Sequence, residues 1–114
     1  MNVAVQGTKE FSDYQVFMRA MGVALSGCKD GEFNVYTAGP ANINSFTAEF
    51  CNLSEAGLRR RSIRVRYFKV PSSYIEEKMS DFSYFAFLST PHQRPSKLVG
   101  SAELSGIEVG IFRY

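Results

Sequence analysis

The 114-residue chain contains no tryptophan, a single histidine and only two cysteines. A cluster of cysteines and histidines is the usual ligand set of a structural metal site, so we expect no metal and no other cofactor. Cys28 and Cys51 do not form a CxxC pair. A disulfide framework is therefore not expected, and a reducing cytoplasm is the favoured location.

Long apolar segments and a strong charge of one sign are also missing. No segment reaches the ~20 apolar residues needed to cross a bilayer. The opening MNVAVQG lacks the basic and long apolar regions of a signal peptide. The 13 basic and 11 acidic residues give a net charge of +2, which does not by itself indicate nucleic acid. We expect a cytoplasmic protein with neither a membrane nor a nucleic-acid partner.

Hydrophobic residues make up 45% of the sequence, which is enough for a core without crosslinks. The length fits one domain, residues 1–114. Short apolar segments alternate with segments of helical periodicity. The predicted strands are Asn2–Gln6, Glu32–Ala38, SIRVRYFKVP (62–71), YFAFLS (84–89) and IEVGIFRY (107–114).

The first predicted helix is capped by Ser12 or Asp13 and ends near Gly27. Its apolar residues recur with the spacing of one buried helical face; they are Phe17, Ala20, Met21, Ala24 and Leu25.

The later helices are predicted from similar signals. Asn42 or Asn44 caps the second helix, which ends in Arg59–Arg61, where cations suit the negative end of the helix dipole. Ser73 and Glu76 form a capping box for a short third helix, and Ser96 caps the fourth. The expected packing residues are Phe46, Phe50, Leu53 and Gly57 in the second helix, and Leu98, Val99, Ala102 and Leu104 in the fourth.

The third predicted strand alternates apolar with basic side chains, for example Val65 and Tyr67 with Arg64 and Arg66. Such alternation suits an edge strand. Alternating strands and helices predict parallel pairing with right-handed crossovers. The expected fold is therefore α/β: a single three-layer, doubly wound, Rossmann-like domain whose five-stranded parallel sheet has the order 3-2-1-4-5.

In such a sheet, ligands bind beyond the carboxyl ends of the strands where the strand order switches. Three segments are predicted to meet there, and two of them lead into helix N-termini that suit a phosphate or carboxylate. The candidate ligand-binding residues are Gly7, Thr8, Lys9 and Phe11; Gly39, Pro40, Ala41, Asn42, Asn44 and Ser45; and Ser89, Thr90, His92 and Lys97.

Each candidate has an expected role. The two glycines let the backbone approach a ligand, the amides and hydroxyls make polar contacts, Phe11 stacks on a base, and Lys9 or Lys97 supplies counter-charge. A simpler interpretation stays open, in which the glycines only make turns and the asparagines and Ser45 only cap a helix. His92 has no carboxylate or cysteine partner in the sequence, so an acid/base role and enzymatic activity are only weakly indicated.

The signature Gly7-Thr8-Lys9-Glu10-Phe11-Ser12-Asp13 resembles that of the SLOG superfamily. The likeness continues in the loop Ala38–Asn44 and in KLVGSAELSGIEVGIF near the C-terminus. These Rossmann-like proteins include nucleotide sensors and the Lonely-guy phosphoribohydrolases, and the small single-domain branch includes phage-encoded members. The resemblance implies a phosphate-bearing ligand such as a nucleotide, and the host cytoplasm as the location of a phage-encoded member.

Two departures from the family pattern concern the expected activity. Ala41 and Asn44 stand where the family has Arg and Asp, and STPHQRPSK replaces the PGGxGTxEE motif with its catalytic glutamate. Phosphoribohydrolase activity is therefore not expected.

Two further features of the sequence concern its surface. The basic residues between Arg59 and Arg66 could contact phosphates, but a helix end followed by a solvated edge strand explains every position and is the favoured interpretation. The many aromatics between Tyr67 and Phe87 predict a partly exposed patch. That patch favours an alternative function: a non-catalytic interaction module, acting on a host protein or forming a homo-oligomer, that has lost ligand binding.

Overall fold

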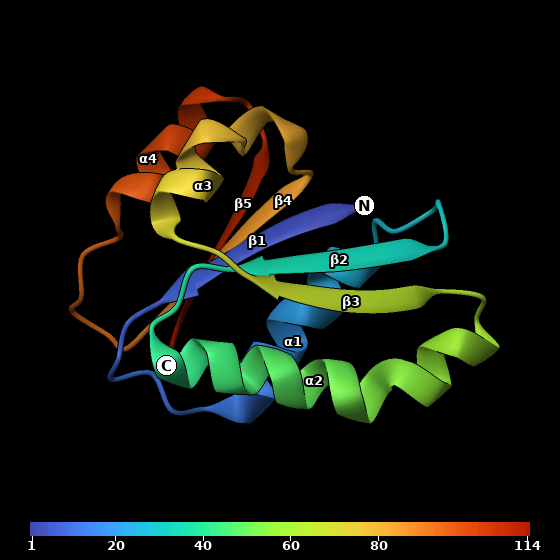
Figure 1. The fold of residues 1–114 in the computed structure, drawn as a ribbon. Coiled ribbons are helices and arrows are strands. Elements are labelled where there is room, and N and C mark those ends of the chain that lie inside the picture. Colours follow the sequence, from blue (N-terminus) through green and yellow to red (C-terminus); the bar gives the residue numbers. More distant parts are fainter.

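The computed structural model describes residues 1–114 as a sheet between two layers of helices (Figure 1). The strands are β1 (Asn2–Gly7), β2 (Glu32–Thr37), β3 (Arg64–Lys69), β4 (Tyr84–Ser89) and β5 (Glu108–Arg113). The helices are α1 (Tyr14–Leu25), α2 (Ala41–Arg60), α3 (Ser72–Glu77) and α4 (Lys97–Leu104), with a 3-10 turn at Met79–Asp81.

All neighbouring strands are parallel, and their order is β3-β2-β1-β4-β5. The predicted fold class and strand order are confirmed. The edge position of the third strand follows from its alternation: Val65 and Tyr67 are half-buried, whereas Arg64 and Arg66 are exposed. A strand with one solvated face is tolerated at an edge of a parallel sheet but not at its centre.

The helices cover the two faces of the sheet unequally (Figure 1). Val3 and Val5 of β1 belong to a core with α1 and α2, while Ala4 between them belongs to a second core with α3 and α4. This division follows from the period of two in side-chain direction along a strand. None of the helices is both long and apolar enough to cross a membrane.

The first helix matches its prediction closely. Asp13 is the N-cap, and its Oδ1 accepts a hydrogen bond of 3.1 Å from the amide of Val16. Four of the five predicted core residues, namely Phe17, Ala20, Met21 and Ala24, are buried.

The predicted caps of α2 and α3 are wrong, and that of α4 is right in position only. Helix α2 begins at Ala41 with Pro40 in the N-cap position, so Asn42 and Asn44 lie inside its first turns. Helix α3 begins at Ser72, with Pro71 in the N-cap position. It has no side-chain cap, so the expected capping box does not form. Ser96 does occupy the N-cap position of α4, but its hydroxyl bonds to Gln6 instead. In two cases a proline, which lacks an N–H and fixes φ, precedes the helix where a polar cap was expected.

Three predicted packing residues are wrong: Gly57, Leu53 and Leu104 are all exposed. Leu53 of α2 is 68% exposed and Leu104 of α4 is 92% exposed. The buried residues of α2 are Ile43, Thr47, Phe50, Cys51 and Leu58, and at 3.6 residues per turn Leu53 lies outside the face that they form. Leu104 is the last residue of α4.

The two cysteines differ in exposure, and this leads to a testable expectation. Cys51 is buried, and burial raises the pKa of its thiol to about 12, so the reactive thiolate is scarce at neutral pH. Cys28 is only half-buried. In native protein at pH 8, we expect iodoacetamide to modify Cys28 but not Cys51, and both after unfolding in urea. Peptide mass spectrometry measures this; modification of native Cys51 at the rate of Cys28 would contradict its burial.

Candidate functional site

The turns that follow β1, β2 and β4 meet at one edge of the sheet. We call these segments, residues 7–11, 39–45 and 89–97, the carboxyl rim. The amide of Gly7 donates to Gly39 O at 3.3 Å, and the amide of Thr8 donates to Leu88 O at 2.9 Å. The first turn is therefore hydrogen-bonded to the second turn and to the end of β4, because β1 lies between β2 and β4.

Gln93, which the sequence pattern does not single out, joins the first and third turns. Its Oε1 accepts hydrogen bonds from Thr8 Oγ1 at 2.6 Å and from the amide of Thr90 at 3.0 Å. Its Nε2 donates to Glu10 Oε2 at 2.8 Å. The hydroxyl of Thr8 and the amide of Thr90 thus already have protein partners. Only the folded loop reveals this role, since a glutamine in STPHQRPSK has no distinctive spacing.

Asn42 and Asn44 also bond within the protein. Asn42 Nδ2 donates to the carbonyls of Thr8 at 3.1 Å and Phe11 at 2.8 Å. Asn44 Oδ1 accepts from Thr37 Oγ1 at 2.7 Å. These asparagines brace the loops against α2. They do not act as caps, and Asn42 Nδ2 and Asn44 Oδ1 already have partners within the protein.

Unpaired hydrogen-bonding groups remain at the rim. The amides of Ala41 and Asn42, at the start of α2, donate to no protein acceptor. The first turn of α2 contains no acidic residue, so nothing offsets the positive end of its dipole. At the end of β4, Ser89 is fully buried and its Oγ has no partner. In native proteins such an atom commonly bonds to water or a ligand.

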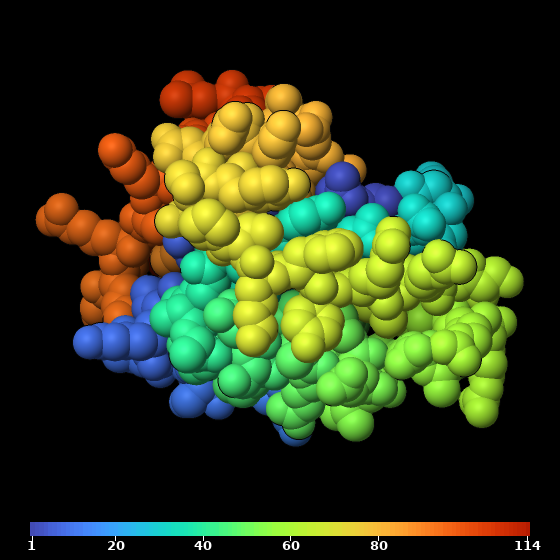
Figure 2. Space-filling model, in the orientation of Figure 1, coloured from blue at the N-terminus to red at the C-terminus, as the bar shows by residue number.

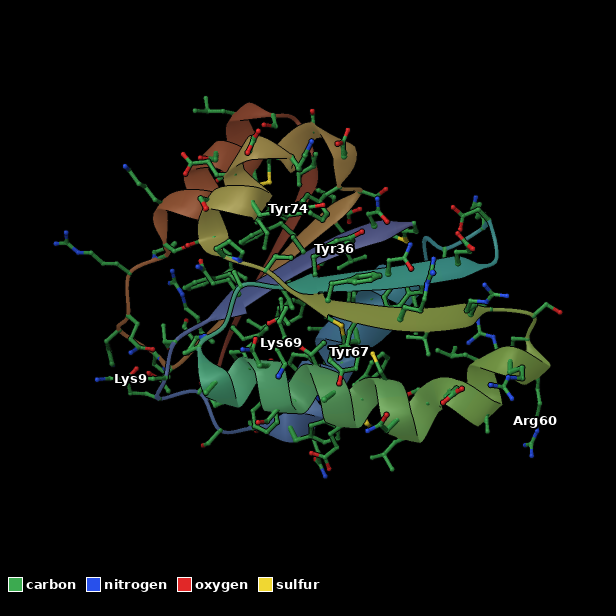
Figure 3. The ribbon with its side chains drawn as sticks, in the orientation of Figure 1. Lys9, Tyr36, Arg60, Tyr67, Lys69 and Tyr74 are labelled. Carbon is green, nitrogen blue, oxygen red and sulfur yellow. The ribbon has the colours of Figure 1, made fainter.

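The charges of the rim are mostly positive and exposed. Lys9, Arg94 and Lys97 are exposed, and Glu10 is the only carboxylate of the three segments. The hydrogen bond from Gln93 lowers the pKa of Glu10, so this carboxylate is ionised at neutral pH. Lys9 projects from the first turn, away from the sheet (Figure 3). His92 is exposed and has a positive φ of 74°, and it makes no hydrogen bond through its ring.

Phe11 and Gly7 do not have the surroundings expected for ligand contacts. Phe11 is 1% exposed and packs edge-on against Phe46 at 6.0 Å, so its ring is not accessible to a base. A Cβ on Gly7 would lie 2.6 Å from Leu88 O, so this glycine permits close packing of the protein's own backbone. Gly39 has a φ of 85°, which favours glycine. Of the remaining candidates, Pro40 is half-buried, whereas Ala41 and Ser45 are exposed.

The main surface depression lies at the opposite end of the strands, where β2 and β3 begin. It has a volume of about 460 Å³ between the end of α2 and the start of β3. Its lining residues are Gly31, Glu32, Glu55, Arg59, Ser62, Ile63, Arg64 and Val65. The carboxyl rim is not hollowed in this way because Gln93 and Asn42 fill the space between its turns.

Three aromatic rings form a column on the α3 side of the sheet. Tyr36 stacks on Phe68 with ring centroids 4.8 Å apart and on Tyr74 at 5.9 Å. Phe68 is 38% exposed and Tyr74 is 37% exposed, so the expected partly exposed aromatic patch is present. Figure 3 shows Tyr36 and Tyr74 on this side, whereas Tyr67 and Lys69 point toward α2.

Comparisons of the chain with models of known protein families, with curated proteins and with solved structures give no match. The part of the SLOG resemblance that the structure confirms is the Rossmann-like arrangement of the parallel sheet. The ligand and the family membership remain predictions.

Proposed function

We propose that this protein binds a small anionic ligand, a nucleotide or a related phosphate-bearing molecule, at the carboxyl rim. The proposal depends on one observation: α2 begins at the meeting point of the turns, with two unpaired amides and no acidic residue in its first turn. Helix N-termini of this kind bind phosphate through their amides and dipole. The signature Gly7–Asp13 and its likeness to SLOG proteins add support.

Other features of the rim agree with an anionic ligand. The rim segments carry three exposed cations and only one carboxylate. The ligand would lie on the exposed surface of the turns, because side chains of the protein fill the interior. Displacement of Gln93 would free the hydroxyl of Thr8 and the amide of Thr90 for the ligand.

Replacement of Ala41 by aspartate tests this proposal. Ala41 is the exposed first residue of α2, and a carboxylate there would interact favourably with the free amides and the dipole. We expect the variant to be as stable as the wild type or more so, by about 0.3–1 kcal/mol. We also expect it to lose the thermal stabilisation that AMP, ATP, NAD or inorganic phosphate gives the wild type.

A matched charge change provides the control. Lys29→Glu makes a larger change of net charge at an exposed loop before β2, away from the rim. It should leave ligand binding intact, as measured by calorimetry. If the wild type binds none of the four probes, or if Ala41→Asp binds them unchanged, the anion site is refuted.

A second candidate function is a non-catalytic protein-interaction module. The observation that favours it is the aromatic column with its half-exposed Phe68 and Tyr74. Tyrosine and phenylalanine are enriched in protein interfaces. The internal hydrogen bonds of the rim also agree with a fold that has lost its ligand.

A further inference from the structure

Strand β3 has one unpaired edge. The amides of Arg64 and Val70 donate to Gly31 O and Thr37 O, next to β2. Because successive peptide groups alternate in direction along a strand, those of Val65, Tyr67 and Lys69 point away from the sheet. No helix lies in front of this edge (Figure 1), and the atoms of β3 are uncovered in the same view (Figure 2). The edge therefore offers three donors and three acceptors to an added strand.

The side chains along this edge are basic. Arg64, Arg66 and Lys69 are three of the six residues of β3, and the strand contains no carboxylate. Arg66 has Glu32 at 3.9 Å, but Arg64 forms no ion pair. Arg64 and Arg66 lie two residues apart on the α3 side of the sheet, where Arg66 Nε also donates to Asn34 Oδ1 at 3.3 Å. Two cations on one face suit acidic side chains at the same two-residue spacing.

The next residue on that face is Phe68, the exposed end of the aromatic column. The Arg66 guanidinium lies 6.0 Å from the centre of its ring. The face of β3 thus reads, from its start, cation, cation, aromatic ring. An added strand would meet these three side chains with every second residue of its own.

The surface depression lies beside the first residues of this edge strand. Arg64 and Val65, the first residues of β3, line it together with Arg59 of α2. A side chain at the end of an added strand could enter the depression and approach Arg64. The β3 edge and the depression contain no residue of the carboxyl rim, which lies at the other end of the strands.

We propose that β3 is a docking site for an extended acidic segment of a partner protein, which adds to the sheet as a sixth strand. Backbone hydrogen bonds would provide affinity, as in other strand-addition complexes. Two Asp or Glu residues, two positions apart, would face Arg64 and Arg66, and an apolar residue two positions further would contact Phe68. The inference is independent of the anion site.

Neither self-association nor protection from aggregation accounts fully for this edge. A second copy of the chain would place cationic strands side by side, and like charges in opposition are destabilising. Protection of an edge from aggregation accounts for the cations, but not for an exposed phenylalanine or for an unpaired arginine beside a depression. Charge complementarity therefore selects an acidic partner.

Selection from a display library of random octapeptides tests the proposal. On the wild type we expect enrichment of peptides with two acidic residues two positions apart, followed or preceded at the same spacing by an apolar residue. On Arg64→Glu/Arg66→Glu we expect lysine or arginine at the two charged positions. Arg60→Glu, an exposed change at the end of α2, should select the same peptides as the wild type.

N-methylation of the best wild-type peptide gives a second measurement that does not depend on the folding of a variant. Methyl groups on alternate amides, those facing β3, should each weaken binding about tenfold by removing a hydrogen bond, and those on the intervening amides should not. No enrichment, enrichment without the two-residue spacing, or uniform methylation effects would overturn the proposal. So would binding of a short single-stranded oligothymidine that Phe68→Ala abolishes, which would assign the face to nucleic acid.

Discussion

Replacing Phe17 by alanine is expected to lower the free energy of unfolding by about 3–5 kcal/mol, the usual cost of removing a buried phenylalanine. Phe17 is fully buried between the helices and the sheet. Its ring packs against Tyr14, Phe46 and Phe50 with centroid distances of 6.3, 5.8 and 6.5 Å. The loss would be a large part of the ~5–15 kcal/mol that stabilises a domain of ordinary size. Urea unfolding followed by circular dichroism measures it.

Leu53→Ala is the control for this experiment. Leu53 also belongs to an apolar stripe in the sequence, but it is 68% exposed. Its removal should change the free energy of unfolding by no more than about 0.5 kcal/mol. Equal losses for the two variants would mean that α2 packs on the sheet through a different face from the one described.

The second large effect is expected for Gly7→Ala. The added Cβ would lie 2.6 Å from Leu88 O and 2.7 Å from Ile43 Cδ1. A backbone oxygen in a central strand cannot move away cheaply, so we expect a loss of about 1–3 kcal/mol, as for other overpacked sites. Strain in the hydrogen bond from the Thr8 amide to Leu88 O would add to this loss. Thermal unfolding and urea unfolding both measure the loss in the free energy of unfolding.

Gly22→Ala provides a control of opposite sign. Gly22 lies in the interior of α1, and a Cβ there meets no atom within 4 Å. Alanine is favoured over glycine in a helix by about 0.5–1 kcal/mol, so this variant should be more stable than the wild type. A stable Gly7→Ala variant would instead show that the first turn is loosely packed and has room for a ligand.

The sequence predicts the fold well because the fold depends on periodicity and edge polarity. The apolar segment YFAFLS, all of it buried in β4, indicates a central strand. The alternation from Arg64 to Tyr67 indicates an edge strand. These signals are local, and the rules for parallel connections leave few ways to arrange five such strands.

The candidate site is predicted less completely, because its geometry depends on contacts between distant loops. The turns meet at one edge, as topology requires. The hydrogen bonds of Gln93 to Thr8 and Glu10 span more than 80 positions of the chain. No local sequence pattern predicts them. Phe11 has an expected ligand role from its position in a motif, but its environment is set by Phe46 of another element.

The place of β1 at the centre of the sheet also determines the order in which the molecule can assemble. Val3 pairs with Val35 on one side but with Tyr84 on the other. A nascent chain could therefore form β1, β2 and β3 with two helices long before β4 is synthesised, and one flank of β1 would stay open in the meantime. Pairing β4 with β1 closes a long loop, and the loss of chain entropy precedes the stabilising contacts between the two strands. The arrival of β4 is therefore the step that covers the open flank of β1, and β5 can add to β4 only afterwards.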